Sequence, residues 1–307
     1  MPLATEAVTL VSLAARCLLG VVVVSFIVAA PAQAQDSPPD PQIELNVVTV
    51  PTTQSLRSHQ SYFRLTHRFN RDLTLGDFSD LAQDLFAFDN GALLGLEYRF
   101  GITSNIQSGL HRSTLDKTLQ VFGRWDAIRQ GQGLPFGVSA LATIEGLDNM
   151  QDGYQPGAAV VLSKTFGRAL ALYASPTYVG GTFDAELVAA QLDGEDHGHD
   201  HLVALSDITD GHDGDDHAEH AGEGTFFIGL GARAQLRPSV FALGEFTPRV
   251  SGHDPGDHMW AVAIEKSTRG HTLALTLTNS YATTPGEIAR GGTPGALYLG
   301  FNITRKF

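Results

Sequence analysis

Cysteine is almost absent from this 307-residue sequence, which contains only Cys17. It follows Arg16 and opens an uncharged run, Cys17–Ala30, and a small-x-small site, Ala32-Gln33-Ala34, comes shortly afterwards. A charged start, an apolar run of this length and such a site are typical of a secretory signal peptide, which we predict for residues 1–34. Cleavage would remove the cysteine, so disulfide bonds and thiolate chemistry are excluded from the mature protein.

Long apolar runs are also missing after residue 34. No stretch there reaches the roughly 18 apolar residues that predict a transmembrane helix, and charged residues are only 17 % of the chain, against about 25 % in soluble domains. The 33 glycines and 17 phenylalanines, with only 3 methionines, indicate a β-rich chain. With 20 Lys and Arg against 33 Asp and Glu, there is no electrostatic basis for binding nucleic acid. The composition favours a membrane β-barrel over a periplasmic enzyme.

Residues 35–56 carry weak strand signals. Ser37-Pro38-Pro39-Asp40-Pro41 cannot pair in a sheet, because proline lacks the backbone donor and has a fixed φ. Ile43–Pro51 is short and extended. We therefore predict a proline-containing periplasmic lead-in over residues 35–56 and a β-barrel over residues 57–307.

The last stretch, Ala296–Phe307, alternates with a period of two, which predicts an amphipathic strand. The polar parity holds Tyr298, Gly300, Asn302, Thr304 and Lys306, and the apolar parity holds Leu297, Leu299, Phe301, Ile303 and Phe307. A final amphipathic strand that ends on Phe resembles the signal by which outer-membrane β-barrels are recognised for insertion. We therefore expect this strand to contact the barrel-insertion machinery and the barrel to contact outer-membrane lipid.

Twelve stretches in all are amphipathic in the extended sense. We expect strands at Ser61–Asn70, Ala92–Phe100, Asn105–Arg112, Lys117–Arg129, Pro135–Gly146, Pro156–Phe166, Ala169–Tyr178, Thr225–Gln235, Val240–Arg249, His258–Lys266, His271–Ser280 and Ala296–Phe307. Short connections alternate with longer ones, as in outer-membrane barrels that have short periplasmic turns and longer extracellular loops. A soluble secreted β-sandwich would alternate in the same way along its strands and is the alternative fold.

The predicted fold is therefore all-β: a transmembrane antiparallel up-and-down β-barrel of about 12 strands, in the outer membrane of a Gram-negative bacterium. In hydrocarbon every backbone N–H and C=O must be paired internally, so the first strand has to pair with the last. The strand pattern does not indicate an oligomeric state.

Three stretches near the start of the barrel, Phe63–Phe69, Asp89–Thr103 and Gly109–Gln120, resemble an uncharacterised bacterial family described as a membrane-bound β-barrel domain. The resemblance extends over about Val48–Phe307, apart from the long loops. It implies a barrel in the cell envelope. It implies no activity and no functional residue, because the function of the family is unknown.

The segment Asp193–Gly224 is the most unusual in composition, with 11 acidic residues and no Lys or Arg. It carries −11 of the formal charge of −13, which leaves −2 for the rest of the chain. Six of the 12 histidines also lie here: His197, His199, His201, His212, His217 and His220. Imidazole with carboxylate suits Zn²⁺, Cu²⁺ or Ni²⁺. The alternatives are loose metal binding at an external loop or a solvated polyanionic loop with no ligand; no other cofactor is predicted.

Charges of both signs occupy the parity expected to face the lumen. They are Arg64, Arg68, Glu97, Arg99, Arg124, Asp126, Glu145, Arg233 and Glu245. Such side chains either pair across a filled lumen or line a polar channel. A 12-strand barrel lies between the filled 8-strand and the open 16-strand cases, so both alternatives stand. In the long connection Arg71–Gly91, Phe78, Leu81, Ala82 and Leu85 fall at helical spacing, with Asp77 or Asp80 near the start. This pattern predicts a short helix that caps the rim or plugs the mouth.

One enzyme hypothesis arises from His111-Arg112-Ser113, an H-x-S step similar to that of outer-membrane phospholipase and lipid A deacylase barrels. No Asn follows this Ser, and both side chains fall on the lumen parity, so we predict no enzymatic activity. We expect a passive pore or envelope-associated barrel, with a metal-capturing surface protein as the alternative and a lipid-modifying enzyme as the third.

Overall fold

Thirteen strands form one antiparallel sheet in the computed structural model, which describes residues 44–85, 87–181, 224–252, 257–268 and 270–307. They are β1 (Ser61–Asp72), β2 (Ala92–Gly101), β3 (Ile106–Ser113), β4 (Leu119–Ile128), β5 (Gly137–Leu147), β6 (Asp152–Phe166), β7 (Leu170–Val179), β8 (Thr225–Arg237), β9 (Val240–Thr247), β10 (Arg249–Ser251), β11 (Met259–Thr268), β12 (His271–Thr278) and β13 (Tyr298–Lys306). All twelve predicted strands are found within a few residues of their expected bounds. The ninth is divided into β9 and β10 at Pro248, which has no N–H to donate to the ladder.

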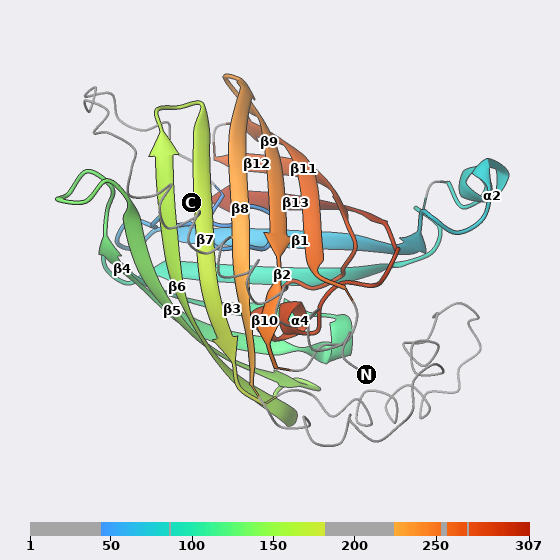
Figure 1. Ribbon diagram of the computed structural model, residues 1–307, viewed down its shortest axis with the longest axis horizontal. Coiled ribbons are helices and arrows are strands. Elements are labelled where there is room, and N and C mark those ends of the chain that lie inside the picture. The colour runs from blue at the N-terminus through green and yellow to red at the C-terminus, as the bar shows by residue number, and fades with distance from the viewer. Residues whose placement is uncertain (1–43, 86, 182–223, 253–256, 269) are drawn as a thin grey trace, which may run out of the picture.

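The sheet closes on itself (Figure 1). From β1 to β9 each strand pairs with the next, β9 pairs with β11, β11 with β12, β12 with β13, and β13 with β1, while the short β10 pairs with β8. The seam runs from Tyr62 opposite Lys306 to Arg68 opposite Gly300. The predicted closed antiparallel barrel is confirmed, and closure pairs every strand of the twelve-strand ring on both sides.

The two rims differ in the length of their connections. On the rim that holds the start of β1 and the end of β13, the turns are short, and those after β6 and β11 turn at Gly167 and Gly270 with φ of 59° and 79°. On the opposite rim the connections after β1, β7 and β12 are long. We call these the short-turn rim and the long-loop rim.

The outer face of the wall is apolar along several strands. Exposed side chains there include Leu96 and Tyr98 on β2, Val262 and Ile264 on β11, and Leu273 and Leu275 on β12. The alternate positions on the same strands are buried and mostly polar. This arrangement suits a wall with hydrocarbon outside and a polar interior. Among the described helices, none has the length and apolar character needed to cross a membrane.

The predicted helix in the connection after β1 is present as α2 (Phe78–Gln83). Asp77 caps it, accepting hydrogen bonds from the backbone N–H groups of Ser79 and Asp80. The helix projects beyond the β1–β2 hairpin (Figure 1), has no buried residue, and leaves Phe78 74 % exposed. It therefore does not plug the mouth. The interior is filled by two other segments.

Candidate functional site

The segment before β1 lies inside the barrel. Leu45, Val47, Val48, Val50 and Leu56 are each at most 2 % exposed. The predicted periplasmic lead-in was therefore wrong for residues 44–56, and residues 35–43 lie outside the described part of the chain. The correction has a physical reason: these apolar side chains gain more from a barrel interior than from water.

This segment is a hairpin that enters from the short-turn rim and returns to it; we call residues 44–56 the inner hairpin. Asn46 and Pro51 form an antiparallel bridge, and Val47 N donates to Val50 O at 2.8 Å across the tip. Thr52 N donates to Leu45 O at 2.9 Å. Backbone hydrogen bonds within the hairpin thus satisfy groups that would otherwise be buried unpaired.

An apolar patch of the inner wall receives the hairpin. Val47, Val48 and Val50 form one buried cluster with side chains of β7, β9, β11 and β12: Ala171, Tyr173, Phe241, Leu243, Ala261, Ala263 and Ala274. At Gly231 on β8, an added Cβ would lie 2.9 Å from Val47 Cγ2, so only glycine allows this close approach. A wall that faced water permanently would not need such a patch.

The tip of the hairpin binds the carboxylate of Glu245, a β9 residue predicted to face the lumen. Glu245 Oε1 accepts hydrogen bonds from the backbone N–H groups of Val48, Thr49 and Val50 at 2.6, 2.7 and 2.6 Å. Its Oε2 accepts from Thr49 Oγ1 at 2.8 Å. Successive N–H groups that converge on one anion form a backbone nest, and hydrogen bonds to a charged acceptor are among the stronger ones in proteins.

A second carboxylate, Glu44, fixes the entering arm of the hairpin. It accepts hydrogen bonds from three wall hydroxyls, those of Tyr62, Thr272 and Thr304. Arg64 Nε lies 3.5 Å from Glu44 Oε1, and the Arg64 guanidinium also donates to the carbonyl of Val48. The entering arm and the tip are thus attached to the wall by polar contacts.

The second segment in the interior is α4 (Pro285–Ala289), which lies inside the ring of strands (Figure 1). Thr284 caps the helix, Pro285 occupies its first turn, and Glu287 completes a capping box. Gly286, Glu287, Ile288 and Ala289 are buried. This short helix therefore has no solvent-facing side, unlike α2.

Several contacts hold α4 against the wall. Ile288 and Ala289 pack with Val179, Phe227 and Met259. A Cβ on Gly286 would overlap the carboxylate of Glu145 and the amide of Gln155, so the helix rests directly on these two side chains. At the end of the helix Arg290 forms an ion pair with Asp116.

The connection that carries α4 is also fixed at its start. Tyr281 donates a hydrogen bond to Asn70 O at 2.9 Å, and its ring packs at a tilt against that of Tyr298, with ring centroids 4.1 Å apart. Burial, reinforced by the hydrogen bond with Tyr298, raises the pKa of the Tyr281 phenol well above its ordinary value. The phenol therefore keeps its proton and remains a donor.

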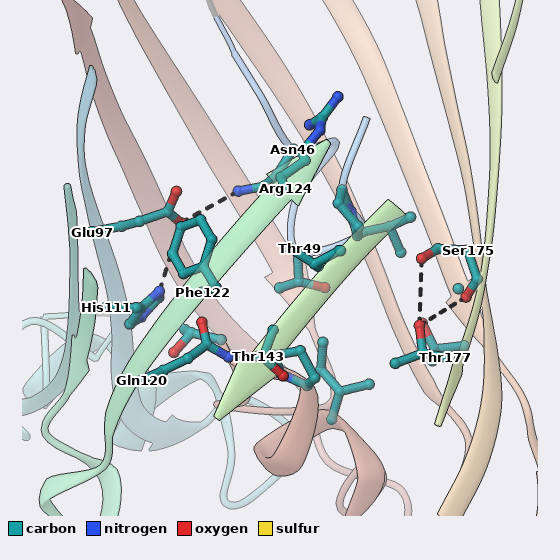
Figure 2. A pocket seen from close by; sticks show the side chains of 18 of the residues that line it. Asn46, Thr49, Glu97, His111, Gln120, Phe122, Arg124, Thr143, Ser175 and Thr177 are labelled. Atoms are coloured by element: carbon teal, nitrogen blue, oxygen red, sulfur yellow. Dashed lines mark hydrogen bonds and ion pairs between the residues drawn. The ribbon is translucent and has the colours of Figure 1, made fainter. Parts of the chain in front are cut away.

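A cavity of about 50 Å³ separates the inner hairpin from α4. The hairpin contributes Asn46 and Thr49 to its lining, and the loop of α4 contributes Thr283 and Ile288. Figure 2 shows Glu97, His111 and Phe122 on one side of the cavity, Ser175 and Thr177 on the other, and Thr49 between them. Both segments thus lie within the ring of strands, with the cavity between them.

The nine residues predicted to face the lumen are all buried or nearly so. Eight are at most 7 % exposed, and the Arg233 side chain is 12 % exposed: Arg64, Arg68, Glu97, Arg99, Arg124, Asp126, Glu145, Arg233 and Glu245. Arg124 Nη2 lies 2.7 Å from Asp126 Oδ1, and Arg99 pairs with Glu97. Glu265, which pairs with Arg233 at 2.8 Å, was not predicted to face the lumen. It has the same parity on β11 as the buried Ala261 and Ala263, and this parity could have identified it as a lumen residue.

The six histidines of the predicted metal loop lie outside the described residues. Within the described ranges, no group of three or more His, Cys, Asp or Glu side chains is arranged to hold a metal ion.

In the H-x-S step, His111 and Ser113 are both 2 % exposed. His111 Nδ1 faces Glu97 Oε2 at 3.6 Å, whereas Ser113 Oγ accepts a hydrogen bond from Leu115 N at 3.2 Å. The two side chains thus have different partners.

A family model described as "Membrane bound beta barrel domain (DUF5777)" matches residues 44–307, most of the chain. The chain belongs to this family. The match starts at the first residue of the inner hairpin, so the family's domain includes the hairpin as well as the wall. The resemblance found in the sequence is thereby confirmed.

Solved structures of porins are similar to the chain at low identity. The NanC porin is 8 % identical with a TM-score of 0.47, covering 80 % of this chain and 98 % of that one. The outer membrane protein Omp33 of Acinetobacter baumannii is 8 % identical with a TM-score of 0.43, covering 83 % and 100 %. No curated protein matches in sequence. The barrel fold of this chain is established by the pairing of its own strands.

Proposed function

We propose that this protein is an outer-membrane channel for small polar solutes that is closed, in the state described, by its own inner hairpin, beside which α4 narrows the lumen. The observation that carries the proposal is the binding of Glu245 by three backbone N–H groups and one hydroxyl at the hairpin tip. These contacts join the tip of the hairpin to the wall, and they can be broken without breaking any contact between the strands of the wall.

The dimensions of the wall support a channel rather than a solid barrel. Eight-strand barrels are filled by their own side chains, whereas 16-strand barrels leave an aqueous channel. Here the twelve-strand ring encloses a two-armed hairpin and a helix. If the hairpin leaves, the space that it occupied becomes continuous with the short-turn rim.

Three features support an outer-membrane location. They are the predicted signal peptide over residues 1–34, the apolar outer face of the wall, and the terminal amphipathic strand that ends on Phe307. With this orientation the short-turn rim faces the periplasm and the long-loop rim faces outward.

A disulfide lock tests the closure. The Cβ of residue 231 would lie 3.4 Å from Val47 Cβ, close to the 3.5–4.5 Å of disulfides, and the mature chain offers no competing cysteine. For Val47→Cys/Gly231→Cys in a planar bilayer, we expect no conductance steps when oxidised and discrete steps after reduction. Deletion of residues 44–56 should give steps in both conditions.

Two controls accompany this lock. Val47→Cys alone should conduct equally in both conditions. Thr53→Cys/Gly137→Cys, whose Cβ atoms would also lie 3.4 Å apart, fixes only the base of the returning arm and should still conduct. Conductance that persists in the oxidised Val47→Cys/Gly231→Cys protein, with the disulfide shown by mass spectrometry, would refute closure by the hairpin.

Capture of divalent metal by the His-rich loop is the second candidate function, supported by six histidines among 11 acidic residues in Asp193–Gly224. Removing this loop should abolish Zn²⁺ binding in equilibrium dialysis and leave the disulfide-dependent conductance unchanged. If the shortened protein binds as much Zn²⁺ as the full chain, the loop is not the metal site. The absence of enzymatic activity stays a prediction.

A further inference from the structure

We propose that the outer face of β11, β12 and β13 at the short-turn rim is a binding site for an anionic phospholipid. Its phosphate contacts Lys266 and Arg305, and its acyl chains lie on the apolar side chains beyond them. The site presupposes the proposed outer-membrane location and adds a lipid partner to the proposed channel. Three observations support it: the distribution of charge between the two rims, the pairing register of these strands, and the apolar rows next to the two cations.

The exposed charged side chains of the two rims have opposite signs. Those of the short-turn rim are all basic: Arg57, Arg129, Arg168, Arg237, Lys266 and Arg305. The exposed acidic side chains of the described residues all lie at the long-loop rim: Asp77, Asp80, Asp89, Asp152 and Asp257. None of the six basic side chains forms an ion pair within the ranges that the structure describes. The short-turn rim therefore attracts anions, and the long-loop rim repels them.

Lys266 and Arg305 retain N–H groups for a ligand. Lys266 Nζ donates one hydrogen bond, to Ser239 Oγ at 2.6 Å. The Arg305 guanidinium lies over the ring of Phe307, 4.8 Å from its centroid. An ammonium has three N–H donors and a guanidinium has five, so both side chains still have donors for phosphate oxygens.

The register places these two cations on either side of β12. Lys266 pairs with Leu273 of β12, and Arg305 pairs with His271, two residues closer to the rim. All four side chains are exposed on the outer face of the wall. Neighbouring strands lie about 4.8 Å apart, which separates the two cations by about 10 Å across the sheet. Their long side chains can therefore approach one phosphate from both sides.

Apolar side chains continue from the cations toward the middle of the membrane. Leu273 and Ile303 lie in the same row as Lys266, and Ile264 and Leu275 lie in the next row. These four apolar side chains are between 42 % and 58 % exposed. A soluble anion would use only the cations, whereas a phospholipid uses the cations and both apolar rows. The surface therefore fits a lipid better than a soluble partner.

Native mass spectrometry of the refolded mature chain in detergent micelles tests the site, with phosphatidylglycerol and with phosphatidylcholine of the same acyl chains. The wild type should bind phosphatidylglycerol more tightly. Lys266→Gln/Arg305→Gln should weaken this binding about 30-fold and leave the binding of phosphatidylcholine unchanged. Arg112→Gln/Lys117→Gln is the matched control, because it removes the same charge from the long-loop rim. It should bind phosphatidylglycerol like the wild type.

Three results would overturn the proposal. They are equal affinity of the wild type for the two lipids, an equal loss of phosphatidylglycerol binding in both double variants, and displacement of phosphatidylglycerol by an equal concentration of glycerol phosphate. The last result would indicate a site for soluble phosphates. The channel is tested separately, because Lys266 and Arg305 lie on the outer face and their exchange should preserve the disulfide-dependent conductance of Val47→Cys/Gly231→Cys. Conductance on reduction without a preference for phosphatidylglycerol would leave the channel and remove the lipid site; the reverse would remove the channel and leave the lipid site.

Discussion

Replacing Glu245 by alanine should release the inner hairpin from the wall. The substitution leaves three backbone N–H groups and one hydroxyl without their acceptor in a buried place. Hydrogen bonds to charged groups contribute roughly 1.5–3 kcal/mol each, and non-additivity reduces the sum. We expect undocking to be favoured by about 3 kcal/mol, or about 100-fold in the population of the released hairpin.

This population can be measured by maleimide labelling of Val48→Cys, a position that is 1 % exposed in the docked hairpin. The labelling rate should rise about 100-fold in the Glu245→Ala background, together with the open probability of the channel. Glu245→Gln retains one acceptor oxygen and should show a smaller increase. Glu265→Ala removes another lumen carboxylate, one that accepts from Arg233 and Ser267 rather than from the hairpin. A similar rise in Glu265→Ala would show that the wall had loosened generally and that Glu245 is not the anchor.

Gly286→Val should displace α4 from the interior. The added side chain would overlap Glu145 and Gln155, both at most 3 % exposed and unable to move into water without leaving the lumen. Overpacking of this kind costs about 1–3 kcal/mol, which predicts an increase of about 5- to 150-fold in the labelling of Ile288→Cys by maleimide. The inner hairpin is attached to other parts of the wall, so the labelling of Val48→Cys should stay as in the wild type.

The matched control for this substitution is Gly244→Val, because a Cβ at Gly244 meets nothing within 4 Å. It should leave both labelling rates unchanged and preserve the heat-modifiable migration of a folded barrel. If Gly286→Val migrates as a folded barrel and Ile288→Cys stays protected, α4 is not held by the contact with Glu145 and Gln155.

Most of the wall could be predicted from the sequence, because a strand with one apolar and one polar face shows a period of two in its own residues. The segment Ala296–Phe307 is an example: its polar parity, Tyr298 to Thr304, is the buried parity of β13. The ninth predicted strand is divided at Pro248 because proline has no N–H to donate, and this break could also have been predicted from the sequence.

The contents of the barrel could not be predicted in the same way. Ile43–Pro51 follows a proline-rich stretch, which favours a periplasmic lead-in, although Leu45, Val47 and Val48 are too apolar to favour water. Its partner Glu245 lies 195 to 197 residues further along the chain, so no local pattern connects them. For α4 a local signal did exist in Thr284-Pro285-Gly286-Glu287, a helix start with a capping box. That signal predicts the helix, whereas its place inside the lumen depends on the closed wall.

The position of the inner hairpin at the N-terminal end of β1 has a consequence for assembly. The seam between β1 and β13 joins the two ends of the domain, so it forms only after the last strand has been made. Only Arg57–Gln60 separate the hairpin from β1, and Glu245, which holds its tip, is on β9. The tip of the hairpin can therefore dock only after β9 has been made, and its apolar cluster is complete only once β12 has been made as well.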